Sequence, residues 1–142
     1  MSNVEGFDVE RDQWIVKKLY SLIEIDEEAR KRGEPAIQPY VLVGQPEDEK
    51  VTTFSNEKGY REAVYEAIQY AVDQASKQER IILCYDGFVR LKGVRMDGLL
   101  YQVYSKDNTW LQFAQGYRPK GLFKQYKRIG DLVFVGEEEY PI

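Results

Sequence analysis

Apolar residues recur at helical spacing in two separate segments of the chain. In the first segment, about residues 8–32, the apolar stripe consists of Ile15, Leu19, Leu22 and Ile23. Gly33 and Pro35 are typical of a helix end and stop this pattern. In the second segment, about residues 56–77, the stripe consists of Val64, Tyr65, Ile68, Ala71, Val72 and Ala75. We therefore predict two amphipathic helices, each with one face packed on other elements.

The remaining apolar segments are short and favour strands. Residues 37–43 and 51–54 flank a polar turn, which predicts a β-hairpin between the helices. Beyond Arg80, further strands are expected at 81–85, 88–91, 99–104, 110–117 and 132–135. The connections between these strands are too short for crossover helices, so neighbouring strands should be antiparallel. The predicted fold is α+β, with two helices packed on a mainly antiparallel sheet in the order helix, β-hairpin, helix, antiparallel meander.

Length and hydropathy limit the class of protein. The 142 residues fit a single α+β domain spanning 1–142, in which 137–142 reads as a short acidic tail. No apolar run approaches the roughly 20 residues that a membrane-spanning helix needs. The first residues are acidic and lack the pattern of a signal peptide, which favours a cytoplasmic protein without membrane contact.

The absence of histidine excludes many familiar enzymes. Histidine is the commonest general base at neutral pH and the commonest metal ligand, and this chain has none. Cys84 is the single cysteine and lies within an apolar run, which favours a buried structural role. No nucleotide-binding or zinc motif is present in the chain. We predict neither a metal site nor a cofactor.

Two Asp-Gly steps give the best candidates for catalysis. Asp86 and Asp97 flank a predicted turn at Lys92-Gly93, which would bring the two carboxylates together with Arg95. Paired carboxylates can divide the roles of acid and base, so Asp86, Asp97 and Arg95 are candidate catalytic residues acting on an anionic small molecule. Asp-Gly is also a common turn or bulge dipeptide, and this structural interpretation is favoured.

The middle of the chain is basic and aromatic. Residues 80–128 hold ten Lys/Arg against three Asp/Glu, together with nine of the nineteen aromatic residues, although the whole chain carries a net charge of −4. A surface of this composition usually meets a partner. The candidate partner-binding residues are Arg90, Arg95, Tyr117, Arg118, Lys120, Lys124, Tyr126, Lys127 and Arg128. Aromatic and basic residues also combine in single-stranded nucleic-acid binding, which segment 117–128 would carry.

One predicted strand is apolar on both faces. Leu99, Tyr101 and Val103 alternate with Leu100 and Tyr104, so the strand is either central or covered by another subunit. A homodimer follows from the second alternative. The leading hypothesis is a small, non-catalytic protein-interaction protein of adaptor, regulatory or toxin-neutralising type, with an acidic partner. An enzyme using Asp86 and Asp97 is the alternative, and single-stranded nucleic-acid binding is the third.

Overall fold

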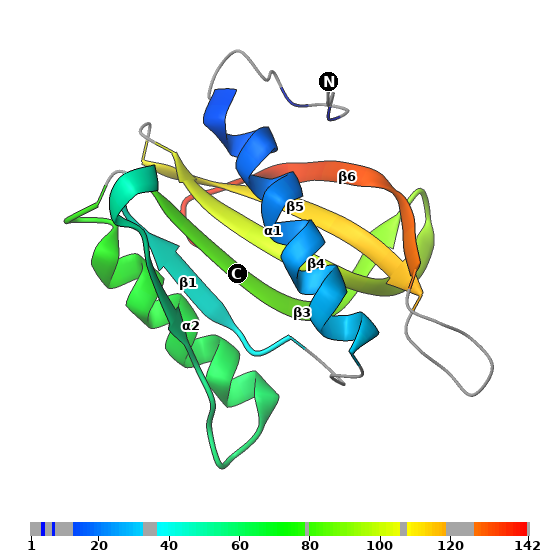
Figure 1. Ribbon diagram of the computed structural model, residues 1–142, viewed down its shortest axis with the longest axis horizontal. Helices are drawn as coiled ribbons and strands as arrows, with labels where there is room; N and C mark the ends of the chain where they lie inside the picture. The colour runs from blue at the N-terminus through cyan, green and yellow to red at the C-terminus, as the bar shows by residue number, and fades with distance from the viewer. Residues whose placement is uncertain are drawn as a thin grey trace. The chain divides into compact units, whose positions relative to one another are not determined.

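The described residues form two α-helices and a six-stranded antiparallel sheet, which confirms the predicted α+β class (Figure 1). The structure is a computed structural model, and it describes residues 4, 7, 13–32, 37–78, 80–105, 108–118 and 127–141. In chain order the elements are α1 (Gln13–Lys31), β1 (Tyr40–Val43), the 3-10 turn η1 (Pro46–Asp48), β2 (Lys50–Thr53), α2 (Tyr60–Gln74), β3 (Ile81–Leu91), β4 (Val94–Ser105), β5 (Thr109–Arg118) and β6 (Lys127–Glu138). Neither described helix has the length and hydropathy needed to cross a bilayer.

The sheet runs in the order β2-β1-β3-β4-β5-β6, with the predicted hairpin at one end and the meander at the other. Strand β1 is antiparallel to both of its neighbours: Tyr40 lies opposite Thr53 of β2 and opposite Cys84 of β3. Strands β3 and β4 are joined by the two residues Lys92 and Gly93, as the sequence predicted. Both have positive φ angles, 51° and 80°, which is typical of the two-residue turns that match strand twist.

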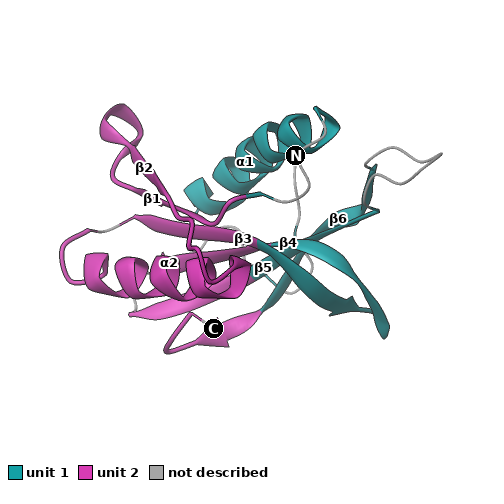
Figure 2. Cartoon of the chain, turned by 90° about the horizontal axis from the view of Figure 1, so that it is seen from below, with its two compact units in different colours: residues 1–37, 86–99, 113–135 teal, residues 38–85, 100–112, 136–142 magenta. Residues whose placement is uncertain are grey.

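The chain divides into two compact units, coloured separately in Figure 2. Unit 1 contains 1–37, 86–99 and 113–135, and unit 2 contains 38–85, 100–112 and 136–142. The assignment of 1–142 to a single domain stays a prediction.

The core of unit 2 forms where α2 packs on β1. Small residues of α2 face the sheet, and Ala67 and Ala71 are fully buried, which allows close approach of the helix backbone. The buried cluster consists of Val41, Val43, Ala67, Ile68, Ala71, Ile81, Leu83 and Trp110. Ile68 and Ala71 belong to the stripe that helical periodicity predicts, whereas Ala67 does not, and Tyr65 of that stripe is 47% exposed.

The core of unit 1 forms under α1. Its predicted apolar stripe is buried, with Ile15, Leu19 and Ile23 fully inaccessible to solvent. A triad of rings lies in the same unit: the Phe7 ring centroid is 5.1 Å from that of Phe113 and 5.3 Å from that of Phe134. Such edge-on and tilted contacts are the geometries that aromatic pairs prefer.

The structure differs from the prediction mainly at the two Asp-Gly steps, which were expected to interrupt strands. The two expected strands 81–85 and 88–91 are one continuous strand, β3, and Asp97-Gly98 likewise lies within β4. Within this strand, the Asp86 carboxylate is held by partners that are distant in sequence. Gly98 faces Val89, and a Cβ at this glycine would lie 2.7 Å from Val89 Cγ1. Here glycine provides space within a strand rather than a turn.

The ends of several helices and strands also differ from the predicted boundaries. Within the described residues, α1 begins at Gln13 and α2 covers 60–74 rather than 56–77. The segment read as an acidic tail begins inside β6, because Glu137 and Glu138 belong to that strand. Beyond β6, the Tyr140 hydroxyl accepts a hydrogen bond from Gln69 Nε2 at 2.8 Å.

Candidate functional site

Two groups of residues in unit 1 contain several of the side chains that the sequence singled out. The first, which we call the Asp86 cluster, consists of Asp86, Arg30, Tyr117 and the backbone of Ile37. The second, which we call the hairpin tip, is the segment 88–95 at the end of strands β3 and β4. The Asp86 cluster is largely buried and the hairpin tip is exposed, and this difference in burial determines which of them is accessible to a ligand or partner.

The Asp86 carboxylate accepts hydrogen bonds from three groups. Arg30 Nη1 donates to Oδ2 at 3.1 Å, and the Ile37 backbone N–H donates to the same oxygen at 2.6 Å. The Tyr117 hydroxyl donates to Oδ1. The Arg30 and Asp86 side chains are only 6% and 9% exposed, so the ion pair is nearly closed to water. A buried carboxylate with three donors is a structural anchor for the elements that supply them.

Arg30 and Tyr117 are also in direct contact with each other. The guanidinium carbon of Arg30 lies 4.7 Å from the centroid of the Tyr117 ring, a cation–π distance. Burial raises the pKa of the Tyr117 hydroxyl, and its hydrogen bond to Asp86 raises it further. The phenol therefore stays protonated as a donor well above neutral pH.

Asp97 is the second predicted carboxylate. It is half-buried on β4, and its charge also raises the pKa of the Tyr117 hydroxyl. The structure thus associates both carboxylates with one buried phenol. Asp86, however, already accepts hydrogen bonds from Arg30, Ile37 and Tyr117 of unit 1, which engages its oxygens in structure.

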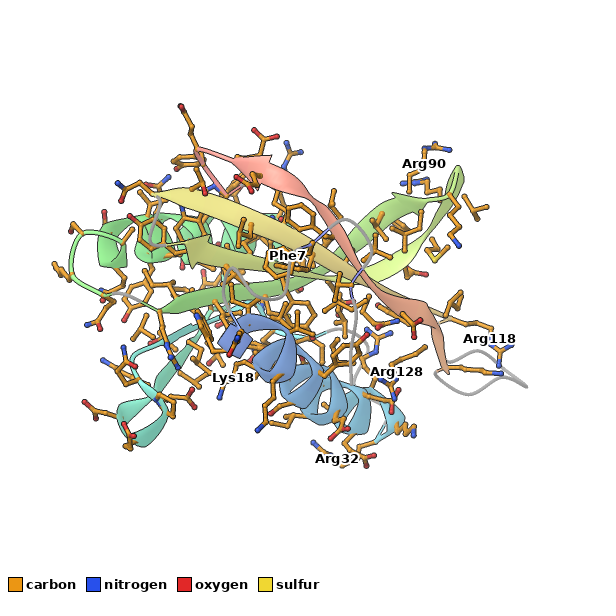
Figure 3. The ribbon with its side chains drawn as sticks, turned by 90° about the horizontal axis from the view of Figure 1, so that it is seen from above. Phe7, Lys18, Arg32, Arg90, Arg118 and Arg128 are labelled. Carbon is orange, nitrogen blue, oxygen red and sulfur yellow. The ribbon has the colours of Figure 1, made fainter. Side chains whose placement is uncertain are left out.

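The hairpin tip has the opposite character. Phe88 and Val94 are 61% and 57% exposed, which is unusual for large apolar side chains. Arg90, Lys92 and Arg95 are all exposed, and the segment 88–95 contains no acidic residue. Figure 3 shows Arg90 at the outer end of the hairpin, with its side chain directed away from the strands.

Two contacts hold the basic groups of the tip in place. The Arg95 guanidinium carbon lies 4.1 Å from the centroid of the Phe88 ring, so the cation is stacked on the exposed aromatic face. Arg90 Nη1 donates to the Gly93 carbonyl oxygen at 3.1 Å, across the turn. These contacts orient the charges without neutralising them.

The other predicted partner-binding residues are dispersed. Arg118 and Lys127 are exposed, whereas Arg128 Nε donates to Glu27 Oε2 at 2.9 Å and lies beside α1 in Figure 3. Tyr117 is only 4% exposed and belongs to the Asp86 cluster. Lys120, Lys124 and Tyr126 lie outside the described residues.

The sequence analysis did not single out Arg30, the residue whose guanidinium donates to the carboxylate of the Asp86 cluster. A signal was present, because Arg30 lies seven residues after Ile23 and so continues the buried stripe of α1. A charged residue at such a position needs a buried partner. The sequence does not say which of the 24 acidic residues supplies it.

The donor chemistry of the described residues does not favour a metal. Among them, no group of three or more Asp, Glu, Cys or His side chains is arranged to hold an ion. The fold and its two clusters define a small α+β protein with a basic hairpin and a buried ionic anchor. Comparisons of the chain with protein-family models, curated proteins and solved structures find no match.

Proposed function

We propose that this chain is a small, non-catalytic protein-interaction protein of adaptor, regulatory or toxin-neutralising type, and that the hairpin tip binds an acidic protein partner. The observation that carries the proposal is the combination, in 88–95, of two exposed apolar side chains with three exposed basic ones. Exposed aromatic and arginine residues are enriched among the side chains that dominate interface energies.

The geometry of the tip supports recognition of carboxylates. The tight turn and the Arg90–Gly93 contact restrict the backbone and one guanidinium before any partner arrives. Stacking of Arg95 on Phe88 presents a second guanidinium beside an apolar surface. A guanidinium forms bidentate hydrogen bonds with carboxylates, and groups that are already oriented lose less entropy on binding.

The alternative enzyme hypothesis needs a carboxylate that is available to substrate. Asp86 accepts from Arg30, Tyr117 and the Ile37 N–H, and this engagement favours an anchoring role over acid–base chemistry. The nucleic-acid hypothesis depends on segment 117–128, most of which lies outside the described residues. We therefore retain it as an outcome of the binding experiment.

The proposal also includes a homodimer in the cytoplasm. The single, buried Cys84 cannot form a disulfide within the chain, as is typical of proteins from reducing compartments. The dimer was inferred from a strand that is apolar on both faces. In this strand, β4, Leu99, Tyr101 and Val103 are fully buried within the chain. Leu100 and Tyr104, on the other face of the strand, are half-buried, and the homodimer stays part of the proposal.

The test is a fluorescence-anisotropy titration of the purified chain with two labelled probes. One probe is a glutamate-rich peptide containing leucine, and the other is an oligothymidylate. We expect the peptide to bind at low salt. The combined substitutions Arg90→Glu and Arg95→Glu should weaken this binding about tenfold or more, because they reverse both arginine charges of the hairpin tip. Affinity should also fall as salt rises, because the Debye length shortens from about 30 Å at 0.01 M to about 8 Å at 0.15 M.

The matched control combines Lys17→Glu with Lys50→Glu, two exposed positions on α1 and β2. It changes the net charge by the same amount and should leave affinity nearly unchanged. Equal losses in both double variants would refute a localised site at the tip. Binding of the oligonucleotide but not of the peptide would instead favour the nucleic-acid hypothesis.

A further inference from the structure

Two arginines lie opposite each other across the β-hairpin at the hairpin tip. Only the two residues Lys92 and Gly93 separate strand β3 from strand β4. A loop of two residues pairs the strand positions symmetrically on its two sides, so Arg90 of β3 lies opposite Arg95 of β4. Opposed side chains share one face of the sheet, with Cβ atoms about 4.5–5.5 Å apart. We call these two residues the arginine pair.

An exposed aromatic ring lies on the same face as the arginine pair. Phe88 is two residues before Arg90 in β3, and alternate residues of a strand share a face. Its contact with Arg95, at 4.1 Å between the guanidinium carbon and the ring centroid, agrees with a diagonal position across the two strands. Phe88 remains 61% exposed despite this contact. The face therefore combines two cations with an accessible apolar surface, and all three residues belong to unit 1.

The charges of the arginine pair are not neutralised within the described part of the chain. There, neither Arg90 nor Arg95 forms an ion pair, and Asp97, the next residue on this face of β4, is half-buried. Like charges that lie directly opposite each other in a sheet are destabilising. Positions that break such a local rule of stability are typical of functional sites. A bound anion of sufficient charge would remove the repulsion.

We propose that the arginine pair binds the phosphoryl group of a phosphorylated serine on a partner protein, and that an apolar side chain close to this serine packs on Phe88. The inference rests on the proposed function, because it names the acidic group that the hairpin tip recognises in its partner.

A phosphoryl group matches the arginine pair better than a carboxylate does. A phosphate monoester carries about −1.5 to −2 charges at pH 7 and has three acceptor oxygens, so one group accepts hydrogen bonds from both guanidiniums. A carboxylate carries one charge, and its two oxygens fit the N–H fork of a single guanidinium. Arg90 donates one Nη1 hydrogen bond to the Gly93 carbonyl, which leaves further N–H donors on the same guanidinium. Charge and donor number therefore favour a phosphate monoester.

The same comparison favours a protein ligand over nucleic acid or free phosphate. Each phosphate of a nucleic-acid backbone is a diester with a single charge, so it has the same deficit as a carboxylate. Inorganic phosphate has enough charge but no apolar group to cover Phe88. Burial of an aromatic ring is a large contribution to protein interfaces. A phosphoserine with a neighbouring apolar residue supplies both contacts.

The experiment is a fluorescence-anisotropy titration of the full chain with three labelled peptides. The peptides share one sequence with a leucine two residues from the variable position, which is phosphoserine, glutamate or serine. We expect the phosphoserine peptide to bind about tenfold or more tightly than the glutamate peptide, because it gains the second guanidinium. The serine peptide should bind most weakly. Unlabelled inorganic phosphate should displace the phosphoserine peptide only at concentrations about tenfold or more above that of the unlabelled peptide.

Substitutions in the chain test the two arginines separately. Arg90→Gln and Arg95→Gln should each weaken binding of the phosphoserine peptide about tenfold, to near the affinity of the glutamate peptide. Arg32→Gln, at an exposed arginine just after α1, removes the same charge by the same substitution and should have little effect. Thermal unfolding checks the fold: the Tm of Arg90→Gln and of Arg95→Gln should equal or exceed that of the wild type, because the opposed like charges are gone.

The outcomes separate this inference from the proposed function. A phosphoserine peptide that binds no more tightly than the glutamate peptide would overturn the phosphoryl site and leave a carboxylate-binding hairpin tip. Equal losses in Arg95→Gln and Arg32→Gln would also overturn it. Displacement by inorganic phosphate at the same concentration as the unlabelled peptide, or tighter binding of an oligothymidylate, would overturn the protein ligand. If neither acidic peptide binds, both the phosphoryl site and the proposed function fail.

Discussion

Removal of the Asp86 charge tests whether the Asp86 cluster anchors unit 1. The substitution Asp86→Asn keeps the size of the side chain but replaces one of its two acceptor oxygens with an NH₂ donor. The three surrounding groups, Arg30 Nη1, the Ile37 N–H and the Tyr117 hydroxyl, are all donors in the wild type. At least one of them then faces another donor, and the buried guanidinium loses its ion pair with Asp86.

The expected cost follows from the burial of the pair. Removing one partner of a buried ion pair typically costs about 3–5 kcal/mol, because the remaining charge is left uncompensated. Asp86 and Arg30 are 9% and 6% exposed, and Arg30 keeps its contact with the Tyr117 ring after the substitution. We therefore expect a loss of about 3 kcal/mol in the free energy of unfolding. For a domain of this size, that corresponds to a decrease in Tm of roughly 10 °C.

The assay is chemical and thermal unfolding followed by circular dichroism at one fixed protein concentration. Asp73→Asn makes the same chemical change at an exposed position on α2 and should alter the free energy of unfolding by less than about 0.5 kcal/mol. Arg30→Met, alone and combined with Asp86→Asn, completes a double-mutant cycle, in which the double variant should be more stable than the sum of the single losses predicts. Equal effects of Asp86→Asn and Asp73→Asn, or strict additivity in the cycle, would refute the anchoring role.

Two further predictions concern unit 1. The pKa of the Tyr117 hydroxyl is raised above its ordinary value of 10.0, so the folded state retains this proton longer than the unfolded state. Its contribution to stability is present below pH 10 and is lost above it, at up to about 1.4 kcal/mol per pH unit. Tyr117→Phe should flatten the alkaline loss in unfolding experiments from about pH 8 to 11, and an unchanged slope would contradict the assignment. Gly98→Ala should destabilise by about 1–3 kcal/mol, because its Cβ would lie 2.7 Å from Val89 Cγ1. Gly136→Ala, whose Cβ would have no neighbour within 4 Å, is the control, and Val89→Ala should partly rescue Gly98→Ala.

Sequence periodicity was sufficient for the two helices, the hairpin between them and part of the core. The α1 stripe around Ile15 and Leu19 is buried, and the turn at Lys92-Gly93 lies where it was expected. These features depend on residues close together in the chain, where spacing and turn chemistry act directly. Short connections also determined the antiparallel order of the meander.

The candidate site was predictable only in part. The exposed basic tip follows from local composition around Arg90 and Arg95, but the roles of Asp86 and Tyr117 do not. A carboxylate at a strand position has the same local pattern whether it faces solvent or a buried guanidinium. Which of these holds depends on Arg30, 56 residues away in the chain.

The sequence by itself therefore determined the α+β class, the hairpin and the basic, aromatic character of the middle of the chain, because periodicity, turn residues and charge are local properties. Tertiary structure alone decided that Asp86 and Tyr117 are anchored to Arg30, that Asp86-Gly87 and Asp97-Gly98 lie within strands, and that β6 is an edge. Each of these depends on partners distant in sequence, and burial and strand order exist only once those partners have come together.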